Sequence, residues 1–340
     1  MDQTEGKYLG YTNYGAVEDV LLIGKEKKSP QIPPRYVRVE VQSISVNPVD
    51  IKILSGEQKY FMSRTFPKAF GTDFFGRVIA VGDKCGRLIQ GQWVVGMSNP
   101  LLKGSGQRFL DIPEKACVSV PPKALDAVGL PAVGVTVLRS LSKAELEYLC
   151  LVAQGRKPSG PGPGFGKKAF VLGANGGVGS IGVQILKLLE YEVHGSASQN
   201  HWRALESLGI SRLFDRNELP CRSEYSVILD CPGLLQCQQI RSLVLGTQSR
   251  YTPVSVPNRN LFQRGWQALS QRPFYSTKLV LAVPSPELIG ILADLRAKNL
   301  LHTPVAHTFS LKNAQKALKV ALAGGYLGKI IITFDEGAPG

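Results

Sequence analysis

The stretch from Lys168 to Leu189 restricts the fold of this chain more than any other, because it joins two apolar segments through a run of glycines. The sequence KAFVLG predicts a buried strand, and GSIGVQILKLLE predicts a helix with one apolar face. Glycine destabilises the interior of regular structure. The four glycines between Gly173 and Gly179 therefore indicate that the turn requires a backbone without side chains.

A strand, a glycine-rich turn and a helix, in this order, form the site at which many folds bind the diphosphate of a dinucleotide. The first N–H groups of a helix have no partners within it and can donate hydrogen bonds to phosphate oxygens. Gly176 would let the backbone approach the phosphates, and Gly179 would let the helix pack closely on the strand. A tight turn without a ligand is the alternative. The residues expected at the diphosphate are Gly173, Ala174, Gly176, Gly177, Val178 and Gly179.

The end of the second predicted strand, YEVHGSA, distinguishes between dinucleotides. Folds that bind NAD place an acid there, about twenty residues after the turn, on the ribose 2′-hydroxyl. Ser196 and Ser198 occupy this place, and hydroxyls can donate to a 2′-phosphate that a carboxylate would repel. Arg203 and Arg216 are candidate cations for the same phosphate. The sequence therefore predicts NADPH rather than NADH.

The order of strands and helices predicts two domains in the 340 residues. Short strands such as YVRVEVQSISV and GQWVVGM, bounded by glycine-containing turns, are typical of a compact β-barrel-like domain. The pattern changes near Lys123, and from Lys168 strands and helices alternate, which predicts a parallel sheet covered on both faces. The Pro- and Gly-rich residues 154–168 predict an exposed, mobile connection. Strand-like segments return near the C-terminus.

The net charge of +14 has two interpretations. A basic surface can attract nucleic acid or a phosphorylated cofactor, or it can simply be solvated. The only dense basic cluster, Lys25, Lys27 and Lys28, falls in a predicted loop before Pro30. Because the other charges are spread along the chain, we favour a solvated surface and keep nucleic acid as the second choice.

The cysteines, histidines and apolar runs indicate which cellular compartment, metals and membrane contacts to expect. The six cysteines form no CxxC pair, which fits reduced thiols and a cytoplasmic location better than a disulfide framework. The four histidines form no metal-binding pattern. No apolar run approaches the length of a membrane span, and the first residues do not resemble a targeting leader. We expect neither a metal nor a membrane partner.

Four segments, SVNPVDIKILSG, FGTDFFGRVIAVG, GANGGVGSIGVQILK and GKIIITF, together resemble the medium-chain dehydrogenase/reductase superfamily. The resemblance runs from about Lys7 to Phe334 and is greatest to the zinc-free quinone oxidoreductase and enoyl-reductase-like branch, which includes the reticulon-interacting oxidoreductases. It implies an α/β fold with a GroES-like, β-rich catalytic domain, residues 1–125 and 284–340. It further implies a Rossmann domain with a doubly wound parallel sheet, residues 126–283, a cleft between the domains, and a homodimer.

The resemblance also bears on the reaction. Zinc-dependent members carry a cysteine near Ser43 to Asn47 and a His-Glu pair after the glycine that matches Gly71, where this chain has SISVN and Thr72-Asp73. Without zinc, alcohol oxidation lacks its Lewis acid, whereas reduction of a quinone or an α,β-unsaturated carbonyl needs none. We expect an NADPH-dependent reductase of such substrates. The alternatives are a trans-acting reductase of carrier-bound enoyl thioesters in fatty acid or polyketide assembly, and a non-catalytic NADPH-binding regulator that binds RNA.

The resemblance assigns catalytic roles to several residues, each with a structural alternative. Asn47, in the family's NP-x-D motif, is expected beside the nicotinamide ribose, or it forms a turn before Pro48. Asp50 either holds this loop, the role that we favour, or polarises a donor. Lys52 either donates a proton to an enolate or lies on the surface.

Further positions are expected at the cofactor. Thr136 would lie near the nicotinamide amide or serve as a buried helix residue. The backbone of Cys231 and Gly233 would contact the cofactor, without a reactive thiol. Lys329 could reach the phosphates from the C-terminal strand.

Overall fold

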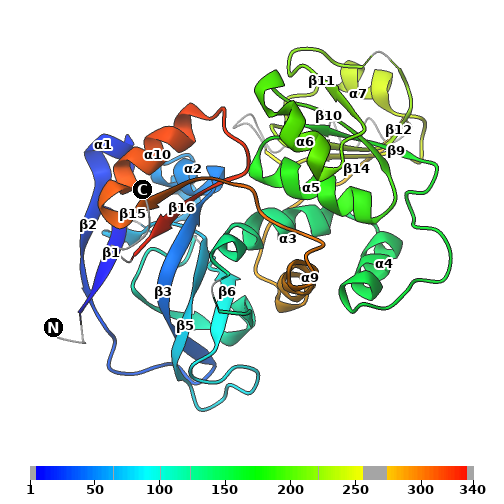
Figure 1. Ribbon diagram of the computed structural model, residues 1–340. Helices are drawn as coiled ribbons and strands as arrows, with labels where there is room; N and C mark the ends of the chain where they lie inside the picture. The colour runs from blue at the N-terminus through cyan, green and yellow to red at the C-terminus, as the bar shows by residue number, and fades with distance from the viewer. Residues whose placement is uncertain are drawn as a thin grey trace. The chain divides into compact units, whose positions relative to one another are not determined.

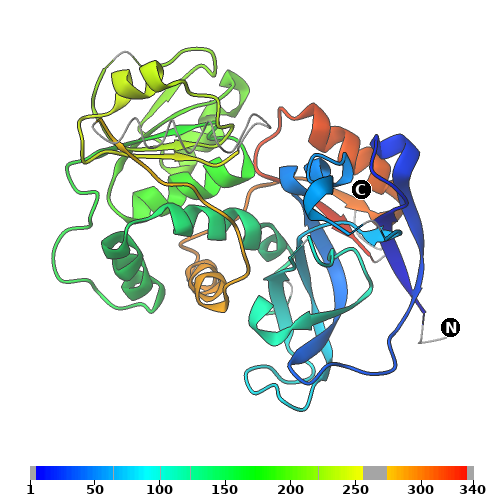
Figure 2. The same ribbon diagram turned by 180° about the vertical axis from the view of Figure 1, so that it is seen from behind.

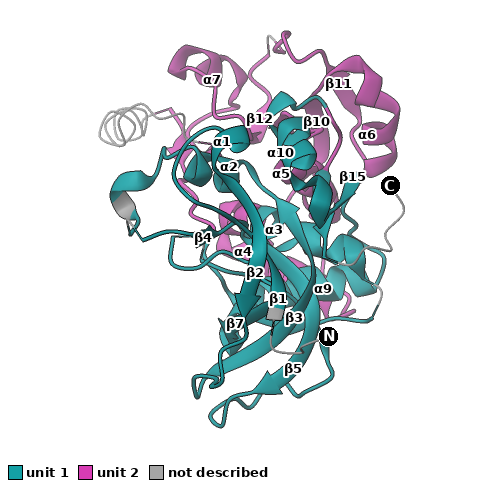
Figure 3. Ribbon diagram, turned by 90° about the vertical axis from the view of Figure 1, so that its left-hand side faces the viewer, with its two compact units in different colours: residues 1–135, 283–325, 329–340 teal, residues 136–282, 326–328 magenta. Residues whose placement is uncertain are grey.

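The computed structural model describes residues 5–63, 65–99, 101–122, 124–220, 222–255 and 274–334. The chain divides into two compact units (Figure 3). Unit 1 comprises Met1–Val135, Val283–Gly325 and Lys329–Gly340, and unit 2 comprises Thr136–Ala282 and Tyr326–Gly328. Two positions that the sequence analysis used, Lys123 and one of the cysteines, Cys221, lie outside the described residues.

The main sheet of unit 1 has the strand order β15-β16-β3-β5-β6-β8, with β7 also paired to β3. Alternation in YVRVEVQSISV predicts a half-buried strand, and Val37, Val39 and Val41 of β3 are indeed fully buried. The pairing of β16 with β3 joins the C-terminal segment of the unit to its N-terminal part. The strands are β3 (Tyr36–Val46), β5 (Asp73–Val81), β6 (Trp93–Met97), β7 (Phe109–Pro113), β8 (Cys117–Ser119), β15 (Val305–Ser310) and β16 (Lys329–Thr333).

A second sheet of unit 1 has the order β2-β1-β4. It contains β1 (Glu5–Tyr11), β2 (Leu21–Lys27) and β4 (Lys68–Ala69), and all its pairs are antiparallel. The prediction of a loop around Lys25 and Lys27 was wrong, because both residues lie in β2 and pair with β1. Charged residues on an outer strand with one free edge discourage pairing with other chains, and this explains why a basic run can be part of a strand.

Helices cover unit 1 at several places. Ser285 and Pro286 start α9 as helix-capping and first-turn residues usually do, with the Ser285 hydroxyl accepting the Leu288 N–H. Figure 1 shows α10 beside β15 and β16, and its Ala317 and Leu318 are buried. The α-helices that lie wholly in unit 1, among its described residues, are α1 (Val17–Val20), α2 (Pro48–Leu54), α9 (Pro286–Ala297) and α10 (Ala314–Ala323), and its 3₁₀ turns are η1 (Lys59–Phe61), η2 (Glu114–Ala116), η3 (Leu125–Gly129) and η5 (Leu311–Asn313).

Unit 2 contains one sheet with the order β11-β10-β9-β12-β13-β14, and every neighbouring pair is parallel. The chain starts in the middle, at β9, extends outward to β10 and β11, and returns to the other side with β12. This is the doubly wound order of a Rossmann fold. Its strands, which can be followed from both sides in Figures 1 and 2, are β9 (Lys168–Leu172), β10 (Glu192–Ser196), β11 (Arg212–Phe214), β12 (Tyr225–Asp230), β13 (Arg250–Pro253) and β14 (Ser276–Thr277).

Helices pack on both faces of this sheet. Ile240 and Leu243 of α7 join Phe170 and Tyr225 in one buried cluster. On the other face Gly182 of α5 lies so close to β12 that a β-carbon would be 2.6 Å from the Leu229 Cδ2. The predicted α/β fold is therefore confirmed. The helices of this part are α3 (Pro131–Ser140), which begins in unit 1, α4 (Lys143–Ala153), α5 (Gly177–Leu188), α6 (Trp202–Leu208), α7 (Cys237–Leu243) and the 3₁₀ turn η4 (Gln199–His201).

The Pro- and Gly-rich connection before β9 is mostly exposed, as expected, and is buried only at Gly162 and Gly164. Residues 156–167 contain no helix or strand, as the composition predicts. However, Gly162 donates its N–H to the Glu190 carboxylate at 2.8 Å, and a β-carbon at Gly164 would be 2.3 Å from the Tyr191 ring. Glycine thus serves close packing at these two positions. Among the described residues, no helix combines the length and apolar character needed to cross a bilayer.

Candidate functional site

The glycine-rich turn between β9 and α5 has the predicted strand–turn–helix geometry. Gly173 has φ +73°, which favours glycine, and the Ala174 N–H donates to the Ser196 carbonyl at 2.9 Å. A β-carbon at Gly179 would be 2.3 Å from the Gly173 oxygen and 2.7 Å from the Ala174 Cα. Because both are backbone atoms, residue 179 must be glycine for the helix to start at this distance from the strand.

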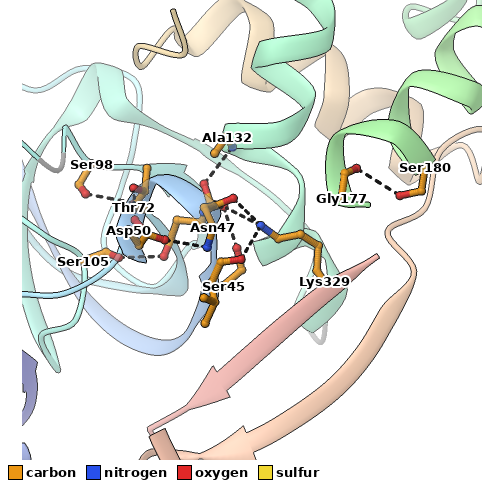
Figure 4. Close-up of polar contacts among 12 residues, drawn as sticks. Ser45, Asn47, Asp50, Thr72, Ser98, Ser105, Ala132, Gly177, Ser180 and Lys329 are labelled. Carbon is orange, nitrogen blue, oxygen red and sulfur yellow. Dashed lines mark hydrogen bonds and ion pairs between the residues drawn. The ribbon is translucent and has the colours of Figure 1, made fainter. Parts of the chain in front are cut away.

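The helix start itself is open. Gly176 is the N-cap residue of α5, and its absent side chain leaves the first turn uncapped. A β-carbon there would meet only the Gly173 oxygen, at 3.5 Å. Gly177 and Val178 are half-buried, and the Ser180 hydroxyl bonds back to the Gly177 carbonyl at 3.2 Å (Figure 4). The residues present therefore fit a diphosphate, since the open space lies at the first N–H groups of α5, which have no acceptor within the helix.

A short C-terminal segment braces this turn within unit 2. The Asn175 side chain donates to the Tyr326 carbonyl at 3.0 Å, and the Gly328 N–H donates to the Asn175 carbonyl at 2.7 Å. None of these three residues belongs to the cofactor site predicted from the sequence. The partners are 151 residues apart for the first bond, and no local pattern indicates their contact.

The predicted adenosine-binding residues lie at or beyond the ends of β10 and β11, whose parallel pairing puts their carboxyl ends at one edge. Ser196 is buried and its carbonyl already holds the glycine turn, whereas Ser198 is half-buried just beyond the strand. Arg203 and Arg216 are exposed. Of the two serines, Ser198 is therefore the more accessible to a ligand.

The loop after β12 is held by one buried carboxylate, that of Asp230. It accepts the Gly233 N–H at 2.8 Å, the Leu235 N–H at 3.0 Å and the Tyr251 hydroxyl at 2.8 Å. Gly233 has φ +69°, and burial raises the pKa of the Cys231 thiol. A thiol with a raised pKa stays protonated and is a poor nucleophile. Asp230 is the organising residue that sequence analysis missed, although its place at a strand end was a usable signal.

In unit 1 the structure gathers several predicted residues around the start of α2. Asp50 accepts the Asn47 backbone N–H at 2.8 Å, and the Thr72 hydroxyl donates to its other oxygen at 2.5 Å. Asp50 is only 2% exposed. Its carboxyl group thus caps α2 and holds the Asn47-Pro48 loop.

Asp73 is the centre of the second half of this cluster. Its carboxylate accepts the Asn47 side-chain amide at 2.9 Å, the Ser45 hydroxyl at 2.7 Å and the Ala132 N–H at 2.9 Å. The Lys329 ammonium lies 3.8 Å from the same carboxylate and donates to the Asn47 side-chain oxygen and the Val46 carbonyl (Figure 4). We call Ser45, Asn47, Asp50, Thr72, Asp73 and Lys329 the buried cluster.

Burial and neighbouring charges shift the pKa values of the ionisable groups in the buried cluster. Burial raises the pKa of Asp50 to about 7, and the charge of Asp73 adds to this rise while the Thr72 hydrogen bond opposes it. Burial also raises the pKa of Asp73, against the influence of the Lys329 ammonium, and lowers the pKa of Lys329. Two carboxyl groups therefore share one cation, and the cluster can exchange a proton near neutral pH.

The structure unites some of the predicted catalytic residues and separates others. Asn47, Asp50 and Lys329 meet in the buried cluster, whereas Thr136 is buried in α3 and belongs to unit 2. Lys52 is half-buried in the last turn of α2. The expected reach of Lys329 toward the phosphates differs from its observed partners, which all lie in unit 1. Thr72 and Asp73, at the positions of the family's zinc ligands, are engaged by Asp50, Asn47 and Lys329, and the described residues contain no group of three potential metal ligands.

Comparisons with known proteins agree with this architecture. Residues 33–137 match the alcohol dehydrogenase GroES-like domain, and residues 210–332 match a family model described as zinc-binding dehydrogenase. The fold and the glycine turn define a two-domain, dinucleotide-dependent oxidoreductase. The chain belongs to the medium-chain dehydrogenase/reductase superfamily, which comprises NAD(P)-dependent dehydrogenases and reductases.

Individual relatives are distant but extend over most of the chain. The chloroplastic quinone-oxidoreductase QR1 of Triphysaria versicolor is 25% identical over 307 residues, 87% of this chain and 89% of the relative. The trans-enoyl reductase pgmF of Aspergillus terreus is 28% identical over 337 residues, 89% of this chain and 87% of the relative. The structure of the quinone oxidoreductase from Coxiella burnetii has a TM-score of 0.82 at 21% identity, covering 97% of this chain and 100% of that chain.

Proposed function

We propose that this protein is an NADPH-dependent reductase that transfers hydride to a quinone or to an α,β-unsaturated carbonyl compound without a metal. The observation that carries the proposal is the open turn at Gly176, a diphosphate site on a Rossmann sheet. In addition, Asp73 is neutralised by Lys329 at a position where zinc-dependent members hold a metal ligand. The names of two relatives, a quinone-oxidoreductase and a trans-enoyl reductase, support this substrate class.

The nicotinamide would supply a hydride, and the proton that completes the reduction would come from a side chain or from solvent. In this proposal the N–H groups of the first turn of α5 bind the diphosphate, and Asp230 orients the Cys231–Gly233 backbone toward the cofactor. The buried cluster fixes the Asn47-Pro48 loop, so Asn47 and Asp50 have positioning roles. Lys52 remains our candidate proton donor and Thr136 our candidate contact of the nicotinamide amide.

The choice of NADPH over NADH rests on Ser198, Arg203 and Arg216. Replacing both arginines with glutamine is expected to weaken NADPH binding by about 10–100-fold, because hydrogen bonds to charged groups contribute about 1.5–3 kcal/mol. NADH binding should change little. Calorimetric titration of both nucleotides measures the difference, and Arg156→Gln is a matched control, since this arginine is exposed in the connection before β9. Equal losses for both nucleotides would reject the 2′-phosphate assignment.

The proposed reaction predicts oxidation of NADPH by quinones and enones. We expect the loss of nicotinamide absorbance with a panel of both, and with enoyl thioesters in free and carrier-bound form. Preference for the carrier-bound thioester would indicate a reductase of fatty acid or polyketide assembly. Bound NADPH without turnover of any substrate would contradict the proposal and support a cofactor-binding regulator, which steeply salt-dependent RNA binding would further specify.

Two further expectations belong to this proposal. The resemblance implies a homodimer, and the cysteine usage favours a reducing, cytosol-like compartment. The described cysteines are all free thiols, Cys85, Cys117, Cys150, Cys231 and Cys237. The name of the Triphysaria relative places that protein in the chloroplast, so location can differ among relatives.

A further inference from the structure

Unit 1 contains a cavity of about 380 Å³ that shares no residue with the buried cluster. Its described walls come from β1, β2, residues 62–63, residues 65–69 and the segment 102–107, all of them in unit 1. Small-molecule sites usually have a volume of about 300–1,000 Å³. The cavity is therefore large enough for a small metabolite.

One of the glycines on this face of the β2-β1-β4 sheet, Gly24, lines the cavity. Partners in an antiparallel pair lie on the same face, and Tyr8 pairs with Gly24, Gly6 with Glu26, and Gly10 with Leu22. Glycine is structurally required at two of these positions, since a β-carbon at Gly6 or Gly10 would lie 2.7 Å or less from neighbouring atoms.

Gly24 has no such requirement. A β-carbon there would meet only Leu22 atoms at 3.9 and 4.0 Å, and its φ is not in the left-handed region. Glycine in a strand interior costs about 0.5–1 kcal/mol relative to alanine. Glycine at an open strand position often marks a place where a ligand comes close to the backbone.

Two polar groups that line the cavity are acceptors without a donor. The side-chain oxygen of Gln107 is buried and unpartnered, and the whole residue is only 5% exposed. One carboxylate oxygen of Glu26 is likewise buried without a partner. Tyr8 lies between Gly24 and Gln107 in a row across the sheet. Since a buried acceptor without a partner is costly, the row is suited to a ligand with hydroxyl groups.

Positive charge exceeds negative charge at the cavity. Among the described lining residues, Lys68 and Lys103 are cations and Glu26 is the one acid, whereas the exposed Lys25 side chain lies on the opposite face of β2. The Lys68 ammonium is held in place by the Ser63 hydroxyl, at 2.7 Å. The apolar side chains of Leu22, Met62 and Leu102 complete the walls.

We propose that this cavity binds a small organic anion that carries several hydroxyl groups, a sugar phosphate or a hydroxy acid. The lysines hold the anionic group, and Gln107 and Glu26 accept hydrogen bonds from the hydroxyls. The site is separate from hydride transfer, and its occupation does not require NADPH.

The test uses the full chain without cofactor and measures thermal stability and calorimetric binding. The probes are glucose 6-phosphate, citrate, inorganic phosphate and glucose. We expect glucose 6-phosphate or citrate to raise Tm. The probe that binds more tightly shows whether the site prefers a sugar phosphate or a hydroxy acid. Phosphate alone and glucose alone should each bind at least about tenfold more weakly than the tighter of these two anions. Phosphate can pair only with the lysines, and glucose can bond only to Gln107 and Glu26.

Two variants localise the binding. Gly24→Val fills the cavity from an open strand position and should abolish binding without loss of stability, since valine favours strands. Gln107→Leu removes the buried acceptor and should weaken binding at least about tenfold. Gly86→Val, at an exposed glycine with no atom within 4 Å of its β-carbon position, is the control. The proposal is overturned if neither anion binds, or if the Gly24→Val protein binds the anion as tightly as the native chain does. The NADPH affinity of the variants, measured in parallel, should equal that of the native chain.

Discussion

The variant Gly176→Ala is expected to fold normally and to bind NADPH about 100-fold more weakly than the native chain. The added β-carbon has room in the protein, because its nearest neighbour is the Gly173 oxygen at 3.5 Å. It would, however, stand where the diphosphate must approach the helix N-terminus. Calorimetric affinity and Tm, measured together, separate the loss of binding from any loss of folding.

Gly179→Ala gives the opposite pattern and serves as the comparison. Its β-carbon would be 2.3 Å from a backbone oxygen, so the helix must shift and unit 2 should lose about 1–3 kcal/mol of stability. Gly246→Ala, in unit 2 with open space at the β-carbon, should change neither quantity. If Gly176→Ala bound NADPH as tightly as the native chain, the diphosphate would not lie on this turn and the proposed function would lose its main support.

The sequence predicts those parts of the fold and the candidate site that depend on local chain geometry. The glycine spacing from Gly173 to Gly179 predicted the turn, because close packing of a helix on its strand permits no β-carbon at that distance. Alternation of strands and helices predicted the parallel sheet of unit 2, because each crossover needs a helix.

It could not predict contacts that the register of distant strands creates. Lys329 meets Asn47 across 282 residues because β16 pairs with β3 in the register that aligns Ile330 with Val46. The expectation that Lys329 reaches the phosphates came from its place in the chain, which says nothing about the direction of its side chain. Likewise, the open position at Gly24 becomes visible only when its neighbours are known, since an isolated glycine in a strand segment has several explanations.

Removing the buried cation with Lys329→Met is expected to destabilise unit 1 by about 3–5 kcal/mol at pH 8, because an uncompensated buried charge remains. Asp73 would keep its three hydrogen-bond donors but lose the ammonium 3.8 Å away. Urea unfolding measures the change. Lys115→Met, at an exposed lysine of the same unit, is the control and should have little effect.

The pH dependence of this loss distinguishes a charge effect from a packing effect. The pKa values of Asp50 and Asp73 are both raised by burial above their usual value of 3.8. A carboxyl group with a raised pKa contributes stability that is complete below its unfolded value and is lost as the pH rises through its folded value, about 7 for Asp50. Without the ammonium both folded values rise further. The Lys329→Met protein should therefore approach native stability at pH 5 and fall well below it at pH 8.

A second substitution tests whether Asp73 is the partner of this charge. In the Lys329→Met background, Asp73→Asn removes the unpaired carboxylate and should recover most of the stability lost at pH 8. By itself, Asp73→Asn leaves Lys329 with one counter-charge fewer and should destabilise the protein. The resulting double-mutant cycle measures the coupling directly. Additive effects, or a loss of stability that is the same at pH 5 and pH 8, would show that Lys329 acts through packing. In that case the pairing of Asp73 with Lys329 would no longer support the proposal that the reaction proceeds without a metal.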